Sequence, residues 1–198
     1  MRTPNADIAF SPSVKSAQER LGSRDQITRM IASRDWPGEI TPDLGEIIAA
    51  ARSFYLGTAS AAGQPYIQHR GGPPGFLCVR DTRTLAFADY RGNRQYITLG
   101  NLADNPRAFI FLMDYTRRQR VKLWGRAHVV EDDTELLRAV SPAVSGSPER
   151  VIVFHLEAWD RNCRQHIPQL LPAEDVAAAI ATLQARIREL EAEIARRG

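Results

Sequence analysis

The sequence predicts a mainly β protein of the α+β class, built on an antiparallel barrel that is closed or nearly closed. Between residues 53 and 159 the chain holds at least six apolar or alternating runs, each of strand length and bounded by turn-forming residues. Successive runs follow one another like hairpins, with short helical segments between some of them. That order is typical of an antiparallel barrel with peripheral helices, and not of a parallel sheet.

Residues 1–50 predict an N-terminal helical extension. Short helices are expected over residues 13–22 and 25–33, the first of them ended by glycine. A third helix is expected to begin at Thr41, a good N-cap residue, with Pro42 in the first helical position. We expect this extension to lie outside the barrel.

Residues 51–168 predict the barrel itself. Two helices interrupt the strands, at about residues 94–101 and at residues 134–140. The run 107–114 is apolar throughout, as in a buried strand, whereas 120–130 alternates. The full set of expected strands is 53–60, 65–70, 76–80, 85–89, 107–114, 120–130 and 150–159.

Residues 169–198 predict a C-terminal helix with a heptad pattern. Its apolar residues alternate spacings of four and three over about three heptads, and charged residues occupy the other faces. A helix with so narrow an apolar stripe needs a partner. The partner is either the barrel of the same chain or a second subunit, and the pattern leaves both open.

The composition is that of one globular domain with appendages. The chain has 198 residues, 43% of them hydrophobic, a net charge of +3 and two cysteines. The charge is too small for a typical nucleic-acid binder, and two cysteines are too few for a disulfide framework. No apolar run is long enough to span a membrane and the N-terminus lacks a secretory signal, so we expect a cytoplasmic protein.

A basic loop after the fourth strand is the densest candidate site. A loop between a strand and a helix N-terminus directs backbone N–H groups outward, where they bind anions. Arginine and asparagine side chains add strong donors. The same pattern also fits a solvated turn whose arginines pair with surface acids. The polar residues of this segment are Asp89, Arg91, Asn93, Arg94 and Gln95.

A second candidate is the end of the second strand, where Gln68, His69 and Arg70 precede a glycine-rich segment over residues 71–75. Glycine in a strand often marks the close approach of a ligand. The glycines also suit a barrel corner that needs curvature, and both interpretations hold together.

A third candidate follows the last strand, where Cys163 and His166 have a CxxH spacing. A zinc site needs four ligands and no second Cys/His pair is close, so no metal is expected. Nothing completes a catalytic triad around Cys163. We expect Gln165 and His166 to act as hydrogen-bonding groups toward a ligand.

Taken together, these segments resemble the pyridoxamine 5′-phosphate oxidase-like family of FMN-binding split barrels. The resemblance covers about residues 50–168. It implies a six-stranded split barrel that forms a homodimer, with an FMN in each of two clefts between the subunits. The segments that carry it are 54–58, 68–76, 87–95, 100–106 and 163–167.

The resemblance also implies roles for particular residues. Residues 93–95 correspond to a serine-arginine-lysine segment that grips the FMN phosphate. Gln95 stands where the oxidase has lysine, so Arg91 and Arg94 are expected to carry the charge. Residues 68–70 correspond to the strand beside the isoalloxazine and ribityl chain. Arg120 lies where a polar residue approaches the pyrimidine edge, and residues 165–166 reach the cleft of one subunit or the other.

We therefore expect an FMN-binding protein, most simply a flavin-dependent oxidoreductase related to pyridoxamine 5′-phosphate oxidase. The oxidase's C-terminal substrate signature is not evident here, which argues against pyridoxamine phosphate as substrate. A non-enzymatic flavin store or sensor, or the same fold with F420 or haem, are the alternatives. No catalytic residue is assigned, although His69 and His166 are the best candidates for proton transfer, because histidine is the side chain that most often serves as a general acid or base. No nucleic-acid or membrane partner is expected.

Overall fold

The computed structural model describes residues 3–141, 146–162 and 165–197. Its elements in chain order are the 3-10 helix η1 (Asn5–Ile8), α1 (Pro12–Arg20), α2 (Arg24–Ser33), α3 (Pro42–Ala50), β1 (Ser53–Ala59), β2 (Pro65–Gly71), β3 (Cys78–Val79), β4 (Thr84–Tyr90), α4 (Ile97–Asp104), β5 (Arg107–Asp114), β6 (Gln119–Val130), α5 (Thr134–Val140), β7 (Pro148–Asn162) and α6 (Ala173–Arg197). None of these helices combines the length and apolar character needed to cross a membrane.

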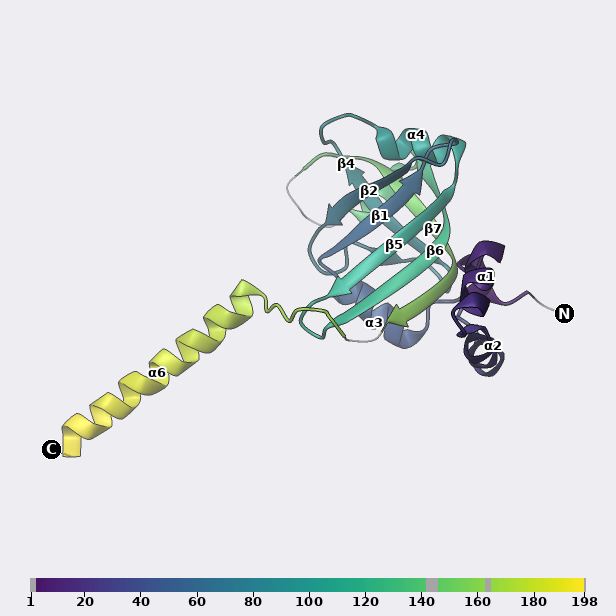
Figure 1. Ribbon diagram of the computed structural model, residues 1–198. Coiled ribbons are helices and arrows are strands. Elements are labelled where there is room, and N and C mark those ends of the chain that lie inside the picture. The colour runs from purple at the N-terminus through teal and green to yellow at the C-terminus, as the bar shows by residue number, and fades with distance from the viewer. Residues whose placement is uncertain (1–2, 142–145, 163–164, 198) are drawn as a thin grey trace.

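The strands form one antiparallel sheet in the order β2-β1-β5-β6-β7-β4-β3, curled around a core (Figure 1). The predicted fold class is confirmed. Among the described residues the sheet has seven strands, because the two-residue β3 adds to the six long ones. No backbone ladder joins β2 to β4 or β3, so the barrel is split along that line.

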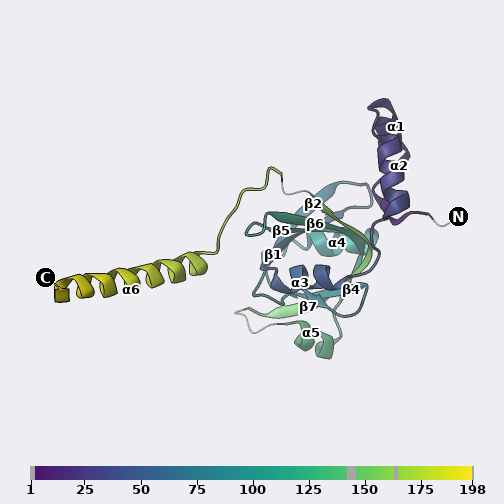
Figure 2. The same cartoon turned by 90° about the horizontal axis from the view of Figure 1, so that it is seen from below.

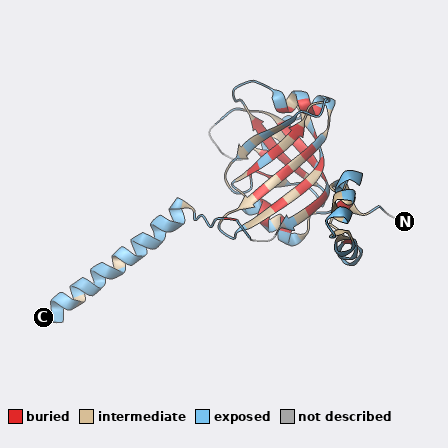
Figure 3. Cartoon of the chain, in the orientation of Figure 1, coloured by how far each residue is buried: buried red, intermediate tan, exposed pale blue. Residues whose placement is uncertain are grey.

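Alternation along the strands places apolar side chains inside the barrel. The largest fully buried ones include Phe54, Leu56, Ile110 and Leu123. Helix α3 adds three apolar residues to the same cluster and so closes one end of the barrel. Figure 3 shows the buried residues concentrated on the strands. Helix α5 covers the outer face of β4 and β7 in a second, smaller cluster.

A β-bulge in β6 brings two backbones unusually close. The register of β6 against β7 shifts between Trp124 and Gly125. A Cβ atom on Gly125 would lie 2.1 Å from the carbonyl oxygen of His155. Only glycine therefore fits at this position, and the barrel bends there.

The part of the N-terminal extension that precedes α3 packs on the outside of the barrel through aromatic residues, whereas α3 itself enters the core and so departs from the predicted position outside the barrel. The ring of Trp36 stacks on that of Trp124 with centroids 4.8 Å apart, and Phe10 packs on Trp36. Thr41 is the N-cap of α3 as predicted, although its hydroxyl contacts the Asp43 carboxylate and caps no backbone N–H group.

Helix α6 extends away from the barrel, as Figures 1 and 2 show from two directions. None of its described residues is buried. Its first turn is tied to the barrel by an ion pair between Arg52 and Glu174 at 2.6 Å. The apolar stripe of α6 is consequently not covered by the barrel of its own chain.

Candidate functional site

A polar cavity of about 240 Å³ opens at the split in the barrel. It lies where β2, β4, the following loop, the start of α4 and β7 meet. Its lining residues are Tyr66, Gln68, Arg70, Asp89, Tyr90, Gly92, Asn93, Arg94, Gln95, Tyr96, Ile97, Thr98, Leu99, Glu149 and Arg150. The structure therefore brings together six of the polar residues predicted from the sequence on two separate segments.

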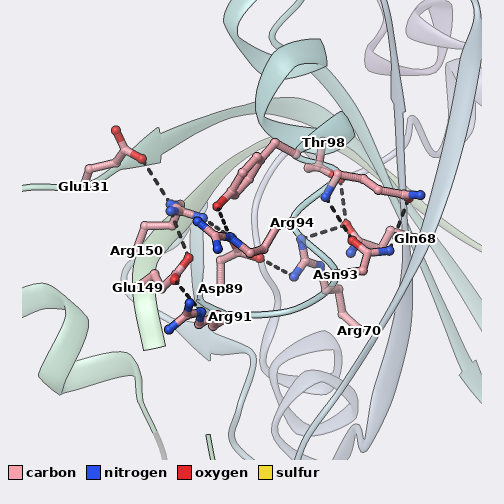
Figure 4. Close-up of polar contacts among 12 residues, drawn as sticks. Gln68, Arg70, Asp89, Arg91, Asn93, Arg94, Thr98, Glu131, Glu149 and Arg150 are labelled. Carbon is pink, nitrogen blue, oxygen red and sulfur yellow. Dashed lines mark hydrogen bonds and ion pairs between the residues drawn. The ribbon is translucent and has the colours of Figure 1, made fainter. Parts of the chain in front are cut away.

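A buried ion-pair network crosses the split beneath this cavity (Figure 4). Asp89 on β4 contacts Arg70 on β2, on the other side of the split. Its second oxygen accepts a hydrogen bond of 3.1 Å from Arg150 on β7. All three side chains are nearly buried. The split is thus bridged by side chains where a backbone ladder is missing.

Arg150 is the centre of this network. It also pairs with Glu131 at 3.1 Å and with Glu149 at 3.0 Å. Burial alone would lower the pKa of Arg150, but the hydrogen bond and charge of Asp89, with the charges of the two glutamates, outweigh burial and raise it. The positive charges of Arg70 and Arg150 are therefore already compensated by protein carboxylates.

Gln68 joins β2 to α4. Its side-chain oxygen accepts hydrogen bonds from Thr98 at 2.7 Å and from Arg70 at 2.9 Å. Both terminal nitrogens of Arg70 thus donate hydrogen bonds to protein side chains, one to Asp89 and one to Gln68. The Nε atom of Arg70 is buried and has no hydrogen-bond partner among the described residues.

The loop between β4 and α4 is exposed but held in a defined shape. Arg94 and Tyr96 both adopt left-handed conformations, with φ of 62° and 54°. Asn93 accepts a hydrogen bond of 3.1 Å from the backbone N–H of Gln95, and Arg94 donates one of 3.2 Å to the Tyr96 hydroxyl. Two left-handed non-glycine residues in one short loop mark a strained segment of the kind that gathers at ligand sites.

This conformation corrects the predicted helix start. The sequence predicted a helix from about residue 94 to residue 101, whereas α4 runs from Ile97 to Asp104. A helix cannot include Tyr96 in a left-handed conformation. The shift places the free N–H groups of the first turn of α4 at the cavity.

The exposed arginines of the loop between β4 and α4, of which Arg94 but not Arg91 lines the cavity, differ from those of the buried network. The hydrogen bond to Tyr96 raises the pKa of Arg94, whose exposed side chain lines the cavity. Arg91 lies 4.0 Å from Glu149, the limit of an ion pair. Arg94 is thus a cation at the cavity for which the structure gives no carboxylate partner within ion-pair distance among the described residues.

The remaining predicted residues lie outside this cavity. His69 points to the other face of β2, packs edge-on against Tyr55 and lines a neighbouring hollow with Phe76. Arg120 is opposite Met113 on β5. Gln165 and His166 are exposed after β7, and Cys163 lies outside the described residues.

Several site residues were not predicted from the sequence. Arg150 and Glu149 begin β7, and Thr98 lies in the first turn of α4. In the sequence, the feature that could have drawn attention to Arg150 is its charge at the start of an otherwise apolar strand. Its pairing with Asp89 depends on the register of β4 against β7, which sequence periodicity does not fix.

The fold and cavity define a split barrel with a polar, arginine-lined pocket at its split. The family model for pyridoxamine 5′-phosphate oxidase matches residues 40–167, and the chain belongs to that family. No curated protein matches the chain.

Two solved structures share the fold. HupZ of Group A Streptococcus is 20% identical with a TM-score of 0.52, and the match covers 67% of this chain and 99% of that one. A candidate pyridoxamine 5′-phosphate oxidase of Lactobacillus delbrueckii is 18% identical with a TM-score of 0.50, covering 63% of this chain and 95% of that one.

Proposed function

We propose that this protein binds FMN in the cavity at the barrel split, with the phosphate on the loop of residues 91–96 and the N-terminus of α4. The observation that carries the proposal is the combination, at one cavity, of a strained loop, a helix N-terminus and a cation that has no carboxylate partner in the part of the chain that the structure describes. Each of the three favours a multiply charged anion.

The charges at the site support different roles for its four arginines. Arg94 and, beside it, Arg91 supply the attraction that a lysine supplies in the oxidase. Arg70 and Arg150 act as positioning residues, because Asp89 already neutralises part of their charge. Gln68 and Thr98 hold the helix N-terminus against β2.

The size of the cavity supports a homodimer. Pockets that enclose a whole small ligand are usually about 300–1,000 Å³, and this one is smaller. The outer face next to it carries exposed Tyr55 on β1 and Ile67 on β2, two apolar residues suited to a subunit contact. A second subunit on this face would complete the site. Arg120, Gln165 and His166 would then serve the cleft from either subunit.

Flavin supplies the redox chemistry of such a site, and the protein binds it and tunes its charge. We infer a flavin-dependent oxidoreductase. The cationic groups of the pocket stabilise negative charge on a bound ligand, and the apolar rings of Phe76 and Phe87 flank the neighbouring hollow. No described residue is assigned as the acid or base.

The proposal is tested by titrating the purified protein with FMN and following the quenching of flavin fluorescence. Saturable binding at one FMN per chain is the expected result. A preparation that binds F420 or haem but takes up no FMN would overturn the choice of cofactor.

Arg94→Ala is expected to weaken FMN binding by roughly tenfold or more, because one charge-assisted hydrogen bond to phosphate is lost. Riboflavin, which lacks the phosphate, is expected to bind both forms equally. Arg83→Ala is the matched control, since Arg83 is an equally exposed arginine that pairs with Glu39 away from the cavity. Unchanged FMN affinity in Arg94→Ala would place the phosphate elsewhere.

A further inference from the structure

The apolar stripe of α6 is exposed along its whole length. Six apolar residues form it, with exposed fractions from 40% to 72%. The helix has 25 residues and touches the barrel only near its first turn. A helix of this kind is marginal in water without a partner for its stripe. The six residues are Val176, Ile180, Leu183, Ile187, Leu190 and Ile194.

The order of spacings assigns these residues to heptad positions. The spacing begins with four, which places Val176 at a d position and the next apolar residue at a. Isoleucine then occupies every a position, at 180, 187 and 194, and leucine occupies d at 183 and 190. Isoleucine at a with leucine at d is the combination that favours a parallel two-stranded coiled coil.

The flanking charges point to the same arrangement. Arg186 falls at a g position, and Glu191 falls at the e position five residues later. In a parallel pair these two positions meet across the interface, so each Arg186 faces the partner's Glu191, twice by symmetry. A fully overlapped antiparallel pair would instead place the two copies of Arg186 opposite each other. Within one chain Arg186 contacts Glu189 at 2.9 Å, an exposed pair that contributes little and leaves the guanidinium free to change partner.

The composition of α6 argues against a membrane surface as the occupant. The helix carries four arginines and five acidic residues, so it has no basic excess to attract anionic lipid. Its outward positions at 178, 185 and 192 are all alanine, which leaves a single apolar seam flanked by small and charged residues.

We propose that α6 pairs with α6 of a second copy of this chain as an in-register, parallel two-stranded coiled coil. Three heptads are short for independent pairing. The pairing therefore draws on the barrel homodimer of the proposed function, which raises the local concentration of one helix near the other. It does not depend on flavin, because no described residue of α6 lines the cavity at the split.

The test is disulfide trapping in the full-length protein, with serine in place of Cys78 and Cys163. Leu190→Cys places a thiol at a d position, where the two copies meet only in a parallel, in-register pair. Mild oxidation is expected to convert most of this variant to a covalent dimer. Ala192→Cys, on the outward face two residues away, is the matched control and is expected to give at most about a tenth as much dimer.

Equal trapping in the two variants would overturn the proposal. So would a heterodimeric disulfide in a mixture of Leu190→Cys and Ile180→Cys, because only an antiparallel pair brings those positions together. FMN titration of the same variants separates this inference from the proposed function. Normal flavin binding with no trapping rejects the coiled coil alone, and trapping in a protein that binds no FMN, with or without its two cysteines, rejects the flavin site alone.

Discussion

At the scale of single residues, the charges around the cavity differ in what they contact. Asp89 is shared by two arginines from two other strands, and these contacts hold β2, β4 and β7 together across the split. Arg94 lies at the surface, donates a hydrogen bond to the Tyr96 hydroxyl, and has a strained left-handed backbone. The first arrangement stabilises the fold. The second leaves positive charge for a ligand.

Asp89→Asn is expected to lower the free energy of unfolding by about 3 kcal/mol, because two nearly buried guanidinium groups lose the carboxylate between them. Urea unfolding monitored by circular dichroism measures the change. Glu131→Gln removes an exposed partner of the same Arg150 and is expected to cost less than about 1 kcal/mol. A cost for Asp89→Asn as small as that of the control would contradict a stabilising role for the network.

At the scale of elements, the periodicity of the sequence predicted where several helices and strands lie. It did not predict the long-range register that brings distant strands together. The boundaries of β5 and α5 match the sequence prediction residue for residue, because each is a single run bounded by clear turn signals. The start of α4 was predicted three residues too early, since the left-handed conformations at 94 and 96 arise from the loop's own hydrogen bonds. The residues at 68, 70, 89 and 93–95 were predicted and do meet. Arg150 and Thr98 were missed because only the folded sheet brings them to the site.

Gly125→Ala tests the bulge in β6. The new methyl group would collide with the His155 carbonyl, and the two strands would have to separate. We expect a loss of about 1–3 kcal/mol in the free energy of unfolding, measured by urea titration. Gly45→Ala in α3 is the control, because its Cβ would meet open space and the helix should gain about 0.5–1 kcal/mol. Similar stabilities for the two variants would show that the bulge tolerates a side chain.

At the scale of the whole molecule, the two proposed contacts between subunits lie on different parts of the chain. One is the outer face of β1 and β2, and the other is the stripe of α6. Their separation allows each to be disturbed alone. A dimer held only by α6 and a dimer held only by the barrel are therefore expected to respond differently when a residue on one of these two surfaces is substituted.

Ile67→Lys is expected to shift the protein from dimer toward monomer in light scattering after size-exclusion chromatography, and to weaken FMN binding at the same time. The reason is that Ile67 is 68% exposed on the face proposed to complete the cavity. Leu21→Lys alters a comparably exposed apolar residue in the N-terminal extension and is expected to change neither property. An intact dimer with full FMN affinity in Ile67→Lys would place the subunit contact on another face.

The split in the barrel has a consequence for motion. Hydrogen-bonded ladders yield only when several backbone bonds break together, whereas a seam joined by side chains yields when one of them changes rotamer. Between β2 and β4 the joining group is the pair Arg70–Asp89. We therefore expect the barrel to open along this line while its strands and its apolar interior stay intact, and the entrance to the cavity to widen and narrow faster than the protein unfolds.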